Sequence, residues 1–214
     1  MSSRAALILS ILIILFSLGV GLYFYPSLPS ELASHWNIHG EVNGHLSKAW
    51  GVVLLPLIMV LLLALLYFLP AIDPLKANWP MFRRSYNLFV VALMIFFAYV
   101  YLLSIFWNLG YTFYHQELLL PAIAFLWFTL GSILPHLKRN WFVGIRTPWT
   151  ISDDRVWEET HHLGGHLFKL SALVTFIGAF FSGGLIPFIV VPLLLSVFIL
   201  LVYSYWDYQR LHKV

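Results

Sequence analysis

The sequence predicts an all-α, polytopic membrane protein, and three observations support this fold class. Of the 214 residues, 61% are hydrophobic and only 10% are charged. A soluble domain carries roughly 25% charged residues, so this chain has too few to cover a globular surface. Long apolar runs recur along the chain, and a helix needs ~20 such residues to cross the ~30 Å core of a bilayer. We therefore expect one membrane domain, residues 1–214, without a separate soluble domain.

Six stretches are predicted to form membrane-spanning helices. The first, 5–25, is too long for the roughly 7–15-residue core of a signal peptide, so we interpret it as an uncleaved first span. The last apolar run, 170–206, contains no charged residue but is too long for one helix. Ser182-Gly183-Gly184 predicts a break within it, and Pro187 suits the first turn of a new helix. The predicted spans are 5–25, 50–72, 86–107, 118–134, 168–181 and 185–206.

The positive charges indicate how these spans are oriented. Six spans place both termini on one side of the membrane, and that side holds all Lys and Arg residues except Lys48. Cytoplasmic loops are enriched in Lys and Arg, so we expect both termini to be cytoplasmic. The residues on this side are Arg4, Lys76, Arg83, Arg84, Lys138, Arg139, Arg146, Arg155, Lys169, Arg210 and Lys213. Because the charge follows topology, we expect no direct binding of nucleic acid.

The first long polar loop, residues 26–49, is expected to be extracytoplasmic. Asn43-Gly44 predicts a turn in it. His35 and His39 have a spacing that zinc ligands on one helix face use, and His45 follows them, so a metal site is one interpretation. A compact loop whose imidazoles make hydrogen bonds is a second interpretation. A docking surface for an extracellular ligand is a third, because His and Trp offer apolar area with a polar tip.

The second long polar loop, residues 136–167, is expected to be cytoplasmic. Tryptophans alternate with cations in it, which is typical of a membrane–water interface. Thr150 followed by Asp153 predicts a helix start. The apolar residues after this start fall on one helical stripe. We expect an amphipathic interfacial helix that leads into the fifth span, with Gly164-Gly165 as the place for a kink.

Arg146 has the most specific expected role in this second loop. Its guanidinium can stack on a tryptophan ring or hold a carboxylate through two hydrogen bonds. We favour an ion pair with Asp153 or Asp154, which would fix the fold of the loop. A lipid phosphate or a partner protein is the alternative ligand.

A metal-dependent membrane enzyme is the main alternative function. Its ligands would come from His35, His39 and His45, or from Glu158, His162 and His166, which share one helix face. The chain has no cysteine, so thiolate zinc sites, iron–sulfur clusters and a thiol nucleophile are excluded. It also lacks a His-Glu-x-x-His run, a glycine-rich phosphate loop and a Gly-x-Ser-x-Gly elbow. We therefore expect no catalytic residues, no metal and no cofactor.

Transport is a further alternative, and the predicted spans disfavour it. No Asp, Glu, Lys, Arg or His lies in the middle of any of them. Pumps and ion-coupled transporters usually need such groups within the membrane. Charge confined to the two faces suits a sensor or a shield better than a conduit.

Two sets of residues carry a family resemblance. The inner-loop set is Asn140, Gly144-Ile145-Arg146-Thr147-Pro148-Trp149-Thr150, Ser152, Trp157, Thr160-His161 and Gly164-Gly165. It resembles the signature of the SdpI family of bacterial and archaeal membrane proteins. The outer-loop set is Leu28-Pro29, His35-Trp36-Asn37, Gly40, Asn43-Gly44 and Ser47-Lys48. It resembles the extracytoplasmic motif of the longer SdpI members.

The resemblance implies a six-span immunity and sensor protein in the cytoplasmic membrane of a prokaryote. Its partners would be a secreted peptide toxin, membrane lipids and a cytoplasmic autorepressor that the protein holds at the membrane. We expect the toxin to contact the outer-loop residues His35, Trp36, Asn37, His39 and Asn43. We expect the cytoplasmic partner to contact the inner-loop residues Asn140, Arg146, Thr147, Trp149, Asp153, Trp157 and His161.

Overall fold

The fold is known from a computed structural model, which describes residues 1–37, 40–111, 115–181 and 186–212. Most of these residues are helical. The helices are α1 (Ser3–Phe24), α2 (Lys48–Ile72), α3 (Trp79–Asn108), α4 (His115–Ile133), α5 (Pro148–Ser152), α6 (Asp154–Gly178) and α7 (Val191–Leu211). Two strands, β1 (Glu31–Trp36) and β2 (Val42–Ser47), pair as an antiparallel hairpin between α1 and α2.

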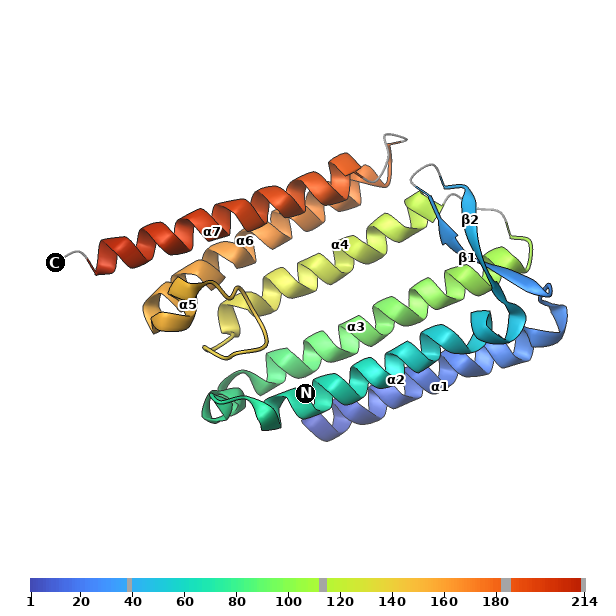
Figure 1. The fold of residues 1–214 in the computed structure, drawn as a ribbon, viewed down its shortest axis with the longest axis horizontal. Coiled ribbons are helices and arrows are strands. Elements are labelled where there is room, and N and C mark those ends of the chain that lie inside the picture. The colour runs from blue at the N-terminus through green and yellow to red at the C-terminus, as the bar shows by residue number, and fades with distance from the viewer. Residues whose placement is uncertain (38–39, 112–114, 182–185, 213–214) are drawn as a thin grey trace.

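The long helices lie side by side along the length of an elongated molecule (Figure 1). The β1–β2 hairpin covers one end, which we call the hairpin end. The chain termini lie toward the opposite end, together with α5 and the segment 134–153 (Figure 1). We call this opposite end the loop end. The two polar loops singled out in the sequence are therefore far apart in space.

Five of the described helical segments are long and apolar enough to cross a membrane. They are Ser3–Ser27, Lys48–Ile72, Lys76–Asn108, Leu118–His136 and Pro187–Leu211. Their outward faces carry large apolar side chains: Leu12, Leu61 and Leu194 are all more than half exposed. Exposing such faces to water would cost free energy, whereas contact with lipid would not. The protein is thus a multi-pass helical membrane protein, as the composition predicts.

Four of the six predicted spans match helices of the structure closely. Spans 5–25, 50–72, 86–107 and 118–134 correspond to α1, α2, α3 and α4, and the last predicted span overlaps α7. A π-helical turn, Ile186–Val190, leads into α7. The break predicted at Ser182-Gly183-Gly184 lies outside the described residues.

The predicted interfacial helix and the predicted fifth span form a single element. Residues 154–178 make one continuous helix, α6, which packs along α4 and α7. Gly164 and Gly165 lie inside this helix. A Cβ on Gly165 would come within 2.7 Å of Pro135 and 2.9 Å of the Gly131 carbonyl. These glycines therefore let α6 approach α4 closely, a common use of small residues between membrane helices.

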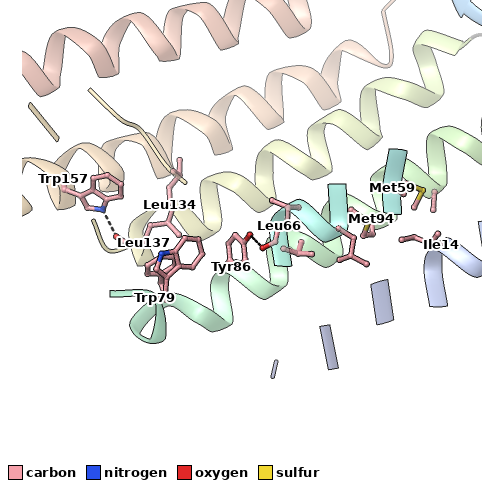
Figure 2. Packing of buried hydrophobic residues seen from close by; sticks show 13 residues of the cluster. Ile14, Met59, Leu66, Trp79, Tyr86, Met94, Leu134, Leu137 and Trp157 are labelled. Atoms are coloured by element: carbon pink, nitrogen blue, oxygen red, sulfur yellow. Dashed lines mark hydrogen bonds between the residues drawn. The ribbon is translucent and has the colours of Figure 1, made fainter. Parts of the chain in front are cut away.

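The core joins α1, α2 and α3 to the loop end. Figure 2 shows its buried side chains running from Ile14 and Met59 to Trp79 and Trp157. Tyr86 donates a hydrogen bond of 2.6 Å to the Leu66 carbonyl, a group of α2 that lacks its intrahelical donor because Pro70 has no N–H. The loop end is thus fixed to the helix bundle by packing and by hydrogen bonds.

The prediction of an all-α chain needs one correction, because the outer loop forms strands. Leu32 and Ala33 of β1 are buried against the bundle, while the residues around them are exposed. Leu32 packs with Leu28, Val52, Tyr101 and Ile105. Burial of these apolar residues, rather than a regular alternation along the strand, explains why the segment is extended here.

Candidate functional site

Asn140 organises the turn at the loop end. Its side chain is fully buried. The amide nitrogen donates to the carbonyls of Lys138 and Val143, both at 2.9 Å. The amide oxygen accepts from the backbone N–H groups of Phe142 and Val143, at 2.9 and 2.7 Å. All hydrogen-bonding positions of the amide are thus filled. Asn140 folds the turn from within and does not reach its surface.

Asp73 attaches this turn to the end of α2. Its carboxylate is buried and accepts from the indole N–H of Trp79 at 2.9 Å and from the backbone N–H of Trp141 at 3.1 Å. Asp73 also accepts from the Leu75 N–H at 2.7 Å. Our sequence reasoning did not select this residue. The signal was Asp73-Pro74 directly after the second span, since Asp before Pro favours a turn.

His161 holds the other side of the loop. Its Nδ1 lies 2.7 Å from the Trp157 carbonyl, which can only accept, so Nδ1 carries the proton. Its Nε2 then accepts from the Ile145 N–H at 3.0 Å. The ring stacks on Trp157 with centroids 4.0 Å apart. Burial lowers the pKa of His161 from 6.5 to about 4, so the ring is neutral at physiological pH.

Gly144 makes room for this histidine. Its φ is +115°, a value that residues with a side chain rarely adopt. A Cβ at this position would collide with Nε2 of His161. Gly144 and His161 therefore pack directly against each other. Trp157, on which the His161 ring stacks, donates its indole N–H to the Leu137 carbonyl at 2.8 Å.

Two threonines start the short helix α5. Thr147 is its N-cap: its hydroxyl accepts from the Thr150 N–H at 3.2 Å, and the Thr150 hydroxyl accepts from the Thr147 N–H at 2.9 Å. This is a capping box. Thr147 also donates to Ser204 of α7 at 3.1 Å. The helix start predicted at Thr150 is thus shifted to Thr147, and Asp153 caps the next helix, α6, through the N–H groups of its first turn.

Arg146 does not form the ion pair that we favoured. It donates to the Trp141 carbonyl at 2.6 Å, and its side chain is exposed. The cation that pairs with Asp154 is Arg139, at 2.9 Å. Asp153 lies 3.6 Å from His212 at the end of α7. Arg139 also donates to the Ile151 carbonyl at 2.9 Å, so its guanidinium lies at the start of α6.

Two tryptophans and an arginine of the loop end lie close together in the segment 141–149. Trp141 is 48% exposed and lies over the Asp73 turn. Trp149 is partly buried and contacts Tyr205 edge-on, with centroids 5.1 Å apart. Arg146 lies between them in sequence. We call Trp141, Arg146 and Trp149 the aromatic–arginine surface. Of the predicted partner-binding residues, Arg146 is exposed, Trp149 and Asp153 are partly buried, and Asn140, Thr147, Trp157 and His161 are buried.

Asp207 is a buried acid that our sequence reasoning also missed. Its residue is fully buried, and one carboxylate oxygen accepts from Arg210 at 2.6 Å. Ser204, three residues before it, is the acceptor for Thr147. Asp207 therefore lies on the face of α7 that packs against the loop-end elements. The signal in the sequence was an acidic residue directly after the charge-free run 170–206, three residues beyond Ser204.

At the hairpin end, Asn108 fastens β1 to the bundle. Its side-chain oxygen accepts from the Ala33 N–H at 2.8 Å, and its amide donates to the Ala33 carbonyl at 3.0 Å. The side chain thus takes the place of a neighbouring strand. It also donates to the Ser104 carbonyl within α3 at 2.9 Å. Asn108 is not among the site residues predicted from the sequence.

The predicted toxin-contacting residues lie around the tip of the hairpin. His35 Nδ1 and Asn43 Oδ1 are 2.5 Å apart across the two strands. Asn37 and Glu41 close the tip through side-chain and backbone bonds of 2.8–3.0 Å. Trp36 contacts Trp107 of α3 edge-on, at 6.0 Å between centroids. The structure therefore brings His35, Trp36, Asn37 and Asn43 together, while His39 lies outside the described residues.

The metal alternative finds no support in the part of the chain that the structure describes. Within those residues, no three His, Cys, Asp or Glu side chains are grouped closely enough to hold an ion. His35 is instead bonded to Asn43, and Glu158 forms an ion pair with Lys138. One member of each alternative ligand set, His35 and Glu158, thus has another partner.

These features define a class: a multi-pass helical membrane protein with a polar hairpin at one end and a structured aromatic loop at the other. The SdpI/YfhL protein family matches residues 136–204, which cover the loop end, the whole of α6 and most of α7. This match over about a third of the chain agrees with the resemblance that the inner-loop residues carry. A domain of unknown function, DUF1648, matches residues 12–60, which contain the hairpin.

One characterised relative covers almost the whole chain. The chain is 24% identical over 207 residues to the immunity protein SdpI of Bacillus subtilis (strain 168), a match that spans 96% of this chain and 97% of the relative. No solved structure matches this protein significantly. The similarity therefore extends over both ends of the bundle, including segments between the two family regions.

Proposed function

We propose that this protein is an immunity protein that protects a prokaryotic cytoplasmic membrane against a secreted peptide toxin. The observation that carries the proposal is the near full-length similarity to an immunity protein. The hairpin at one end and the aromatic–arginine surface at the other supply two separate surfaces, and among the described residues no three His, Cys, Asp or Glu side chains are grouped to hold a metal. Binding, and not catalysis, is the activity that these features support.

The proposal includes a topology of six spans with both termini in the cytoplasm. Five segments qualify as spans by length and composition. The sixth is the second half of α6, whose first half carries the charged residues that lower its mean hydropathy. Six crossings agree with termini at the same end of the bundle (Figure 1). The loop end then faces the cytoplasm, because it carries most of the Lys and Arg residues.

In this arrangement the hairpin tip meets the toxin. His35 and Asn43 are exposed and bonded to each other, so their positions are fixed before a ligand arrives. Prior order lowers the entropy lost on binding. Trp36 adds an indole whose contact with Trp107 links the tip to α3. The opposite, aromatic–arginine surface is the candidate contact for a cytoplasmic repressor.

Survival of a sensitive bacterium tests the proposal. Cells that express this protein are challenged with a secreted killing peptide of the SDP type, beside cells that express His35→Ala/Trp36→Ala. We expect the native protein to protect and the double variant to lose protection at an equal membrane level. His45→Ala is the matched control, because His45 is also exposed on the hairpin but is not a proposed contact. Failure of the native, correctly inserted protein to protect would contradict the proposal for this toxin class.

A further inference from the structure

A cavity of about 290 Å³ lies beneath the hairpin. Leu32 and Leu46 of the hairpin form its roof, and α2, α3 and α4 form its walls, with Ile58, Tyr101, Ser104 and Leu119 among the lining residues. Ile58 is also 40% exposed, so the cavity borders the apolar outer surface of α2. That surface belongs to a candidate membrane span, and lipid is its natural surroundings.

The lining does not suit water or an ion. No charged residue contributes to it. The Tyr101 hydroxyl already donates to the Val52 carbonyl at 3.0 Å, and the Ser104 carbonyl already accepts from Asn108. An ordered water needs two to four polar partners, and apolar cavities without them stay dry. Ser34, Trp36 and Ser104 add polar side chains to the lining, and apart from these and Tyr101 its residues are aliphatic or glycine, so the occupant that fits it is largely apolar.

The lining then distinguishes a peptide from a lipid chain. An extended peptide would bring backbone N–H and C=O groups that the lining cannot pair. A hydrocarbon chain has no such groups. The space is about twice the ~150 Å³ apolar cavity that accepts benzene.

We propose that this cavity binds one fatty acyl chain of a lipid from the leaflet at the hairpin end. The site shares one lining residue, Trp36, with the proposed toxin contacts, but its occupation does not depend on the proposed immunity function. The chain enters past Ile58 and ends beneath Leu32 and Leu46. A bound acyl chain then supports the hairpin from below, opposite the Asn108 clamp.

Photo-crosslinking in proteoliposomes tests the site. The probe is phosphatidylcholine with a diazirine in one acyl chain, and labelled residues are mapped by mass spectrometry. We expect strong labelling around Ser104, and we expect Ser104→Phe and Leu119→Phe, which fill the cavity from two different helices, each to remove most of it. Val197→Phe, on the exposed face of α7, is the control and leaves this labelling unchanged. Labelling around Ser104 that survives both filling variants in folded protein would overturn the proposal.

A second measurement asks whether water fills the space. The chain has no cysteine, so Ser104→Cys creates a single thiol. In proteoliposomes, we expect this thiol to resist a charged, membrane-impermeant maleimide and to react after detergent removes the lipid. Rapid reaction with the charged reagent in the intact bilayer would show an aqueous cavity and would contradict an acyl-chain site. Folding of every variant is checked by gel filtration and circular dichroism.

Discussion

At the scale of single residues, the loop end separates structural from exposed side chains. The polar atoms of Asn140 and His161 all have hydrogen-bond partners within the loop end. Arg146 donates to the Trp141 carbonyl, and its side chain remains exposed. A sequence motif does not distinguish these roles, because the same residues would be required for folding and for binding. Only the partners of each polar group, which come from distant parts of the chain, make the distinction.

The buried His161 predicts how stability depends on pH. Its pKa is about 4 in the folded protein and 6.5 when unperturbed. Between these values the unfolded chain binds more protons, so stability falls as pH falls, by at most about 1.4 kcal/mol per pH unit. Above pH 6.5 the stability that depends on a neutral His161 is fully present, and below pH 4 protonation of His161 causes no further loss of stability. Chemical unfolding in detergent across this range measures it.

The control for this prediction is the neighbouring histidine. His161→Gln should remove much of the pH dependence between 6.5 and 4 and also lower stability at neutral pH. His162→Gln, at an exposed position, should leave the pH dependence in place. An unchanged pH profile in His161→Gln would show that other groups cause it.

Gly144 gives a second prediction at this scale. Gly144→Ala should destabilise the protein by at least about 1–3 kcal/mol, because it combines a strained φ with a collision against His161. Gly19→Ala is the matched control, since nothing lies within 4 Å of a Cβ at that position in α1. Equal unfolding midpoints for the two variants would argue against the tight packing of Gly144 on His161.

At the scale of elements, apolar runs predicted the helices and could not predict the hairpin. The runs that form α1, α2 and α3 are long, so burial in lipid decides their structure. The segment Glu31–Trp36 has no regular alternation, and its strand depends on Asn108, which lies 75 residues from Ala33. The continuity of α6 was missed for a similar reason: its glycines suggest a kink until Gly131 and Pro135 are seen opposite them.

The Asn108 clamp therefore predicts the order of the hairpin. Asn108→Leu removes both bonds to Ala33, and each such bond contributes roughly 1 kcal/mol. We expect the Ala33 amide to exchange with deuterium faster, by roughly 10–30-fold, while amides in the middle of α3 keep their protection. Asn43→Ala, which changes an exposed hairpin amide, serves as the control and should affect Ala33 much less.

At the scale of the whole molecule, the charge distribution and the number of helices together predict how the protein is oriented in the membrane. The Lys and Arg residues within the described ranges are distributed very unequally along the bundle, and among them only Lys48, the first residue of α2, lies at the hairpin end. The proposed topology therefore places thiols introduced at the two ends on opposite sides of the membrane. In the cysteine-free chain, Ser34→Cys should react with an impermeant maleimide in intact cells, and Ser152→Cys should react only after permeabilisation. Reaction of Ser152→Cys in intact cells would refute six spans with this orientation.

The two ends also predict two separable functions, and one experiment measures both in the same cells. Cells of a sensitive strain express a fluorescent repressor and are challenged with the toxin. Survival is measured, and recruitment of the repressor to the membrane is imaged. We expect His35→Ala/Trp36→Ala to lose protection, and Arg146→Ala to keep protection but lose recruitment. Arg155→Ala, another exposed cation near the loop end, should keep both. Loss of protection in Arg146→Ala, at native membrane levels and with the hairpin variant still protective, would contradict the assignment of toxin binding to the hairpin end.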